Sequence, residues 1–73
     1  MERVKIATIH RLIKEAGAER VSKEAAIALG KVLNRIGTEI AKEAIEYAHY
    51  AKRKTVKPSD IEMAYKKFLK RSL

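Results

Sequence analysis

The chain has 73 residues, no cysteine and a net charge of +8, from 17 Lys and Arg against 9 Asp and Glu. A domain this small buries only about 60% of its unfolded surface and usually needs a disulfide, a metal or a partner. The absence of cysteine excludes disulfides and thiolate metal sites, and two histidines are too few for a metal site without added carboxylates. We therefore expect oligomerisation, with no metal and no cofactor.

The positive charge favours a polyanion as the partner. No apolar run approaches the length of a membrane span, and no secretory signal pattern is present, so we expect a soluble intracellular protein. Attachment to an anionic membrane surface is the weaker alternative, because the basic residues fall in short loop clusters and not along one helix face.

The first expected element is a short helix over 9–16, after an extended lead over 1–7. Thr8 is the expected N-cap, and Gly17 ends the helix as its C′ residue. A helix of about two turns does not persist alone, so it must pack on another element. Its apolar face is formed by Ile9, Leu12, Ile13 and Ala16.

A long helix is expected from Ser22, its N-cap, to about Ala51. Its length is roughly 42 Å, whereas a compact chain of this size has a radius of gyration of about 11 Å. A helix of this length carries an apolar stripe that is too long for the rest of its own chain to cover, which predicts a second subunit. Inside the helix, we expect close approach of another helix at Gly37. For Gly30 two alternatives remain: the glycine is merely tolerated in the helix, or it allows another helix to approach closely. The apolar stripe consists of Ala25, Ala26, Leu29, Val32, Leu33, Ile36, Ile40, Ala44, Ile45, Tyr47 and Ala48.

The third expected helix covers 58–70 and follows a loop, KRKTVK, in which four of six residues are basic. Pro58 suits the first helical position, and Asp60 and Glu62 suit the first turns. The pattern predicts one all-α domain over 1–73 with a short, a long and a short helix. Two such chains can cross their long helices. The inward face of the third helix is formed by Ile61, Ala64, Tyr65, Phe68 and Leu69.

Catalysis is not expected. Ser59 with His49 is a conceivable nucleophile and base, but no nucleophile elbow or glycine-rich phosphate loop appears. The Glu residues mostly lie beside Lys or Arg on solvent faces. We therefore predict neither an enzyme nor a small-molecule substrate.

The two polar loops offer a binding function instead. In a dimer with crossed long helices, the first loop of one chain lies near the second loop of the other, which would bring Arg20, Lys54 and Thr55 together. Arg and Lys neutralise phosphates, and a Thr hydroxyl can donate to phosphate oxygens. Neither loop contains an aromatic residue, which argues against single-strand stacking. The alternative is a solvated basic turn, which is common.

Three motifs carry a resemblance: RLIKEAGAERVS at 11–22, IAKEAIEYA at 40–48 and RKTVKPSDIE at 53–62. With their spacing, they resemble the archaeal histones over nearly the whole chain. The resemblance implies a histone-fold handshake dimer that wraps double-stranded DNA and stacks into longer superhelices. It also implies a cytoplasmic protein associated with the chromosome or nucleoid.

By matching position, the resemblance implies that Arg20 enters the minor groove, braced by Thr55. Arg11 would meet phosphate beside the paired helix N-termini. Lys14 would add phosphate attraction, although a solvated lysine is an equal alternative. The full set of implied DNA contacts is Arg11, Lys14, Arg20, Lys54, Thr55 and Lys57.

The resemblance also implies an internal ion pair between Arg53 and Asp60, with a structural role for Arg53. A contact between dimers would use Tyr47, Tyr50, Asp60 and Met63.

The chain departs from the family pattern in several places. Tyr50 stands where the family often has His, which puts stacking of dimers in question. Lys52 replaces a usual Gly, so that the helix end differs or carries left-handed strain of ~1 kcal/mol. Lys5 and Thr8 replace the usual N-terminal prolines, and His10 replaces a small residue. We expect His10 to be an exposed bystander, and an approach of His10 to DNA is the weaker alternative.

We therefore expect an architectural protein whose dimers bind, bend and wrap duplex DNA with little sequence specificity. Two alternatives remain. One is a histone-fold subunit of a heteromeric transcription or assembly factor. The other is an unrelated basic helical bundle that binds RNA.

Overall fold

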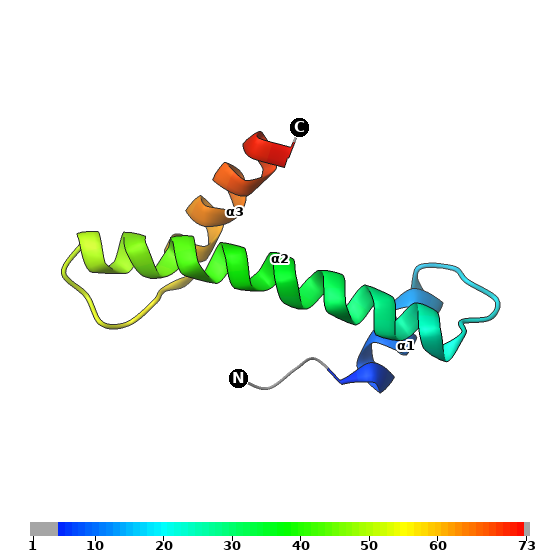
Figure 1. Cartoon of the computed structure of the whole chain (residues 1–73). Helices are drawn as coiled ribbons and strands as arrows, with labels where there is room; N and C mark the ends of the chain where they lie inside the picture. Colours follow the sequence, from blue (N-terminus) through cyan, green and yellow to red (C-terminus); the bar gives the residue numbers. More distant parts are fainter. Residues whose placement is uncertain (1–4, 73) are drawn as a thin grey trace. The chain divides into compact units, whose positions relative to one another are not determined.

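The computed structural model describes residues 5–72, which form three α-helices and no strand (Figure 1). The helices are α1, Ile6–Glu15, α2, Lys23–Tyr50, and α3, Pro58–Ser72. The expected all-α class with a short, a long and a short helix is confirmed. The chain divides into two compact units, Met1–Ile36 and Gly37–Leu73, and α2 contributes one half to each.

Helix α1 begins at Ile6, three residues earlier than expected, and Lys5 is its N-cap. The prediction of Thr8 as the cap is wrong, because the amide nitrogens of Thr8 and Ile9 already donate to the Lys5 carbonyl. Ile6 lies one turn before Ile9, and both line one groove against α2. The apolar face of α1 therefore extends toward the N-terminus beyond the polar Thr8. The rest of the expected extended lead, residues 1–4, lies outside the described residues.

Helix α1 ends as the sequence predicts, with Gly17 as the C′ residue at a φ of 121°. The Gly17 amide donates to the Lys14 carbonyl at 3.0 Å, and the Ala18 amide donates to the Ile13 carbonyl at 3.4 Å. These two bonds form a Schellman motif, which requires a left-handed residue where the chain turns away.

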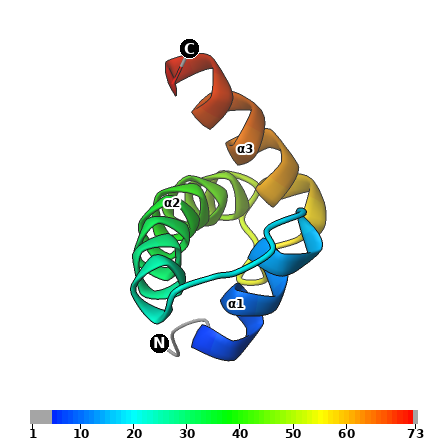
Figure 2. The ribbon, with the colours of Figure 1, turned by 90° about the vertical axis from the view of Figure 1, so that its right-hand side faces the viewer.

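The core of the first unit is small. Figure 2 shows α1 lying beside the first turns of α2, and Ile9 and Ala26 are the buried apolar residues of this contact. A Cβ placed on Gly30 would lie 3.8 Å from Cγ1 of Ile9, so α1 approaches α2 at this glycine. Apart from its chain neighbours and the nearby backbone of α2, no atom of the described residues lies within 4 Å of a Cβ placed on Gly37. The close approach expected at Gly37 therefore stays a prediction about a second copy of the chain.

The second unit pairs the last half of α2 with α3. Its buried apolar residues are Ala44, Ala48 and Ala64, all of them small. Pro58 is the first residue of α3, as predicted. The helix runs to Ser72, slightly beyond the expected end at 70, and the Glu43 carboxylate on α2 pairs with Lys67 and Arg71 of this last part.

Many large apolar side chains remain exposed on the single chain. Ile9 is the only large apolar side chain that is buried among the described residues, and the other buried apolar positions are alanines. None of the described helices is long and apolar enough to cross a bilayer. The exposed large apolar residues are Ile6, Leu12, Val32, Ile45, Tyr50, Val56, Ile61, Met63, Tyr65 and Leu69.

Candidate nucleic-acid interface

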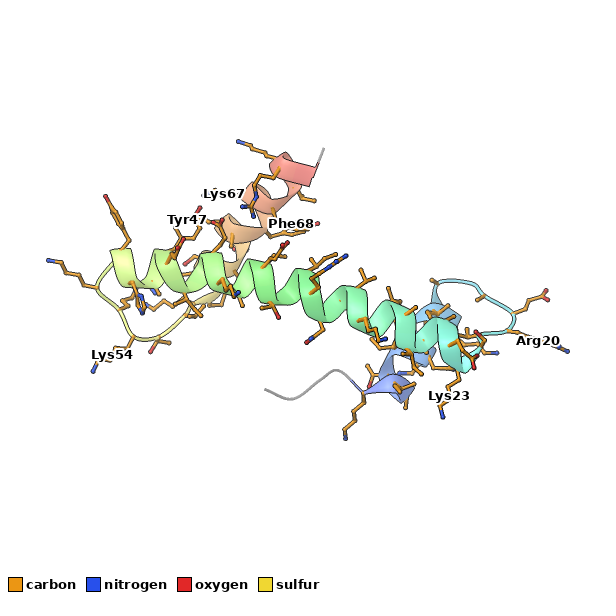
Figure 3. The ribbon with its side chains drawn as sticks, viewed as in Figure 1. Arg20, Lys23, Tyr47, Lys54, Lys67 and Phe68 are labelled. Carbon is orange, nitrogen blue, oxygen red and sulfur yellow. The ribbon has the colours of Figure 1, made fainter. Side chains whose placement is uncertain are left out.

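The first loop, residues 16–22, carries Arg20 between two capped helix ends. Ser22 caps α2 as predicted, because its Oγ accepts a hydrogen bond from the Ala25 amide at 3.0 Å. The Schellman motif at Gly17 closes the other end of the loop. Arg20 is exposed, and its side chain points away from the ribbon in Figure 3.

Two side chains of α1 hold the backbone of this loop. Nζ of Lys14 donates to the Glu19 carbonyl at 2.8 Å. Nε2 of His10 lies 3.2 Å from the Val21 carbonyl in a part-buried contact. The expectation that His10 is an exposed bystander is therefore wrong. Sequence reasoning treated His10 alone, whereas its position one turn before Lys14 on the same helix face was the available signal.

Arg11 also lies on α1 and is exposed to solvent. It belongs to the same unit as Arg20, so this unit presents one exposed arginine on α1 and one on the first loop. An exposed guanidinium can donate to phosphate oxygens without first breaking contacts in a core.

The second loop, residues 51–57, is held by the ion pair between Arg53 and Asp60. The Arg53 guanidinium donates to both carboxylate oxygens of Asp60, each at 2.9 Å, and to the Thr55 carbonyl at 2.9 Å. The Asp60 carboxylate also accepts the Lys57 amide at 2.8 Å, which caps α3. The structure thus brings together the two residues expected to pair, and Asp60 ties the loop to α3 at Arg53 and at Lys57.

The electrostatics of this ion pair follow from its hydrogen bonds. The Arg53 guanidinium and the Lys57 amide both stabilise the carboxylate, and they lower the pKa of Asp60 to about 2. Asp60 is only 2% exposed, and the same hydrogen bonds compensate its desolvation. Arg53 therefore serves the shape of the loop, and the exposed residues beside it are Lys54, Thr55 and Lys57. In Figure 3 the side chain of Lys54 points away from the ribbon.

The helix end before this loop has an unusual residue. Lys52 adopts the left-handed conformation with a φ of 58°. Its amide donates to the His49 carbonyl at 2.9 Å, and the Arg53 amide donates to the Ala48 carbonyl at 2.8 Å. The helix therefore ends in the same Schellman motif as α1, but a lysine takes the position that favours glycine.

The four residues expected at a contact between dimers differ in exposure. Tyr50 is 91% exposed, Met63 is 48% exposed and Tyr47 is half-buried. Asp60 is buried within its own chain, where both of its oxygens accept hydrogen bonds from Arg53. The contact between dimers stays a prediction for all four residues, and Asp60 is the least accessible of them.

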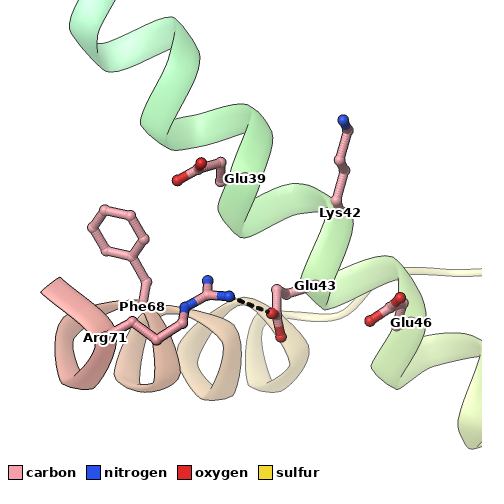
Figure 4. Close-up of a pocket in the computed structure, with 6 residues that line it drawn as sticks. All are labelled: Glu39, Lys42, Glu43, Glu46, Phe68 and Arg71. Atoms are coloured by element: carbon pink, nitrogen blue, oxygen red, sulfur yellow. Dashed lines mark ion pairs between the residues drawn. The ribbon is translucent and has the colours of Figure 1, made fainter.

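A polar groove lies between α2 and α3 of the second unit, with a volume of about 440 Å³ (Figure 4). Its centre is Glu43, whose carboxylate pairs with Lys67 at 3.3 Å and with Arg71 at 3.2 Å. Sequence reasoning missed this cluster, although the four-residue spacing of the two cations on α3 was visible. Among the described residues, no group of three or more His, Cys, Asp or Glu side chains is arranged to hold a metal ion.

The loop residues lie in different units. Arg20 belongs to the first unit, and Lys54 and Thr55 belong to the second. The expected meeting of these three residues depends on a second chain, so it stays a prediction.

Comparison with known proteins identifies the family. The family described as histone-like transcription factor (CBF/NF-Y) and archaeal histone matches residues 3–65. One of the subunits of the archaeal histone HAN1 of Thermococcus zilligii is 50% identical over 66 residues, which cover 90% of this chain and 98% of that protein. The probable archaeal histone 3 of Methanocaldococcus jannaschii is 41% identical over 64 residues, covering 88% of this chain and 96% of that protein. With the three motifs and the short–long–short helices already described, these matches show that the chain belongs to the family of histone-like transcription factors and archaeal histones.

Proposed function

We propose that this chain is an architectural protein of the chromosome whose homodimers bind, bend and wrap double-stranded DNA. The observation that carries the proposal is the pair of anchored loops, one in each unit, with Arg20 exposed on the first and Lys54 and Thr55 exposed on the second. Family membership supports it, because both relatives are named archaeal histones. The chain has no small-molecule substrate or catalytic step in this function.

The exposed apolar side chains support a dimer. The two units bury mostly alanines and leave large residues such as Val32, Ile45 and Tyr65 at 41–50% exposure. A second copy covers such surfaces when two long helices cross, and the hydrophobic gain stabilises both copies. In that arrangement the first loop of one copy lies beside the second loop of the other. The histone-fold domain over 1–73 is then completed only in the dimer.

The proposed mechanism uses charge and shape. A dimer of two +8 chains carries +16 and presents three basic ridges, two of paired loops and one of paired α1 helices with Arg11. Each ridge binds phosphates where the duplex turns toward the protein, and Arg20 enters the minor groove there beside Thr55. Lys54 and Lys57 contact the backbone. Sequence preference then arises from how easily the DNA bends.

Longer assemblies are the finer part of the proposal. Tyr50 and Met63 present exposed surface for a contact between neighbouring dimers, with Tyr47 at its edge. Tyr50 can donate one hydrogen bond but carries no positive charge, so this contact is weaker than one made by a protonated histidine. Nuclease digestion of reconstituted complexes tests the point. A ladder with a fixed increment indicates stacked dimers, and one short protected fragment indicates isolated dimers.

Replacement of Arg20 by alanine tests the proposed function directly. We expect Arg20→Ala to weaken duplex binding by about tenfold or more and to reduce supercoiling of closed circular DNA, with the helical content unchanged. Lys70→Ala is the matched control, because it removes one exposed charge from the far end of α3. Gel retardation and a topology assay provide the measurements. Unchanged retardation and topology in Arg20→Ala, or a preference of the wild-type chain for duplex RNA over duplex DNA, would refute the proposal.

A second candidate function has specific support. The family description includes transcription factors, and the name of the HAN1 relative describes one part of a larger assembly. In that case the exposed apolar face is covered by a different chain. Sedimentation of the chain expressed alone separates the two functions. A monodisperse homodimer supports the architectural function, and insolubility without a partner supports a heteromeric factor.

A further inference from the structure

Two hydrogen bonds from α1 meet the first loop on either side of Arg20. Lys14 holds the carbonyl of Glu19, and His10 contacts the carbonyl of Val21. His10 and Lys14 lie four residues apart, so both side chains project from one face of α1. The residue between the two anchored carbonyls is the exposed arginine of the proposed DNA interface.

In both contacts the side chain is the hydrogen-bond donor and the backbone carbonyl is the acceptor. A carbonyl oxygen only accepts, so Nε2 of His10 bears the proton in this contact, and the Lys14 ammonium donates in the other. The bond from Lys14 is charge-assisted and short, at 2.8 Å. Anchoring the carbonyl groups of the residues before and after Arg20 restricts the backbone from which its side chain projects. A loop that is already ordered loses less conformational entropy when it binds.

We infer that His10 and Lys14 are positioning residues, which preset the loop so that Arg20 projects toward the duplex. This inference rests on the proposed function. It gives Lys14 a role different from direct phosphate attraction. It also gives a role to His10, which was expected to be a bystander. The two contacts serve the first loop as the ion pair of Arg53 with Asp60 serves the second.

A double-mutant cycle on the full chain tests the role of His10. The variants are His10→Leu, His10→Gln, Arg20→Ala and the combination of His10→Leu with Arg20→Ala. Binding to a mixed-sequence DNA duplex is measured under conditions where circular dichroism shows each variant folded. We expect His10→Leu to weaken binding by about fivefold to tenfold, because each loop of the dimer loses one hydrogen bond. His10→Gln retains an N–H donor and should restore most of the affinity.

The cycle distinguishes positioning from independent effects. If His10 acts through Arg20, His10→Leu has almost no further effect in the Arg20→Ala background. Amide hydrogen exchange across residues 16–22 should also accelerate in His10→Leu and not in His10→Gln. Additive losses of affinity, or wild-type binding and exchange in His10→Leu, would overturn the role of His10.

The salt dependence of binding tests Lys14. A direct phosphate contact contributes about 0.9 to the slope of log K against log salt, whereas a positioning residue contributes none. We expect Lys14→Met to lower the affinity with the wild-type slope, and a reduced slope would overturn its positioning role.

The same measurements separate this inference from the proposed function. If Arg20→Ala weakens binding but His10→Leu and Lys14→Met do not, only the inference fails. If the wild-type chain does not bind duplex DNA, the proposed function fails first.

Discussion

The helices before the two loops end with the same pattern of hydrogen bonds, but the loops themselves are held by different contacts. Both α1 and α2 close with a Schellman motif, but the left-handed position is Gly17 in the first unit and Lys52 in the second. The first loop is then held by donors from the helix before it. The second loop is held by Arg53 and by Asp60 of the helix after it.

This difference teaches how two loops of similar length respond to different conditions. The first loop is held by two donors, Lys14 and His10, and neither contact uses a carboxylate. The second depends on a carboxylate, which loses its charge in acid. The second loop is therefore the acid-sensitive one, and it also carries the larger number of basic residues.

Removal of Asp60 should have the largest effect on this comparison. Asp60→Ala removes the carboxylate that accepts from the Arg53 guanidinium and from the Lys57 amide, so we expect the largest fall in melting temperature among these variants. Glu62→Ala, an exposed carboxylate on the same helix, is the control. Melting is followed by circular dichroism at one protein concentration, because dimer stability depends on concentration. An equal melting temperature for Asp60→Ala and the wild type would contradict the role of the ion pair.

Acidification should destabilise the second loop, as the removal of the Asp60 carboxylate does. The folded-state pKa of Asp60 is about 2, below its ordinary value of 3.8, so its contribution to stability is complete above about pH 4. That contribution is lost as the pH falls from about 4 through about 2. Hydrogen exchange should therefore accelerate in residues 51–57 before it accelerates in residues 16–22. Asp60→Asn should remove this part of the pH dependence, and equal acid responses of the two loops would contradict it.

Replacement of each of the two left-handed residues should change the free energy of unfolding by a smaller amount, with opposite signs. Gly17→Ala puts a Cβ at a φ of 121°, and we expect a loss of roughly 1–2 kcal/mol in the free energy of unfolding. Lys52→Gly relieves strain at a φ of 58°, and we expect a gain of about 1 kcal/mol. Urea unfolding at a fixed dimer concentration measures both. A loss of stability in Lys52→Gly would show that the lysine side chain contributes more than the strain costs.

Much of the local structure could be predicted from the sequence. The Gly17 and Ser22 caps, the first residue of α3 and the order of the three helices follow from residue types at particular spacings. The pairing of Arg53 with Asp60 came from the family resemblance, since spacing alone does not show that two side chains seven residues apart will meet across a loop.

The errors have one physical cause. The start of α1 at Ile6 and the contact of His10 with Val21 both involve contacts between α1 and other parts of the chain. A polar Thr8 offers a local cap, but the apolar contacts of Ile6 and Ile9 favour a longer helix. The double pairing of Glu43 depends in the same way on where α3 crosses the end of α2.

The sequence by itself determined the order of the helices, the caps at Gly17 and Ser22, the net positive charge and an apolar stripe longer than one chain covers, because these depend on neighbours along the chain. Only the tertiary structure decided which side chains hold the loops, because those contacts join residues on different elements. His10 and Lys14 hold the first loop, and Asp60 holds the second through Arg53. A periodic pattern specifies the face of a helix, whereas a hydrogen bond between elements requires their positions in space.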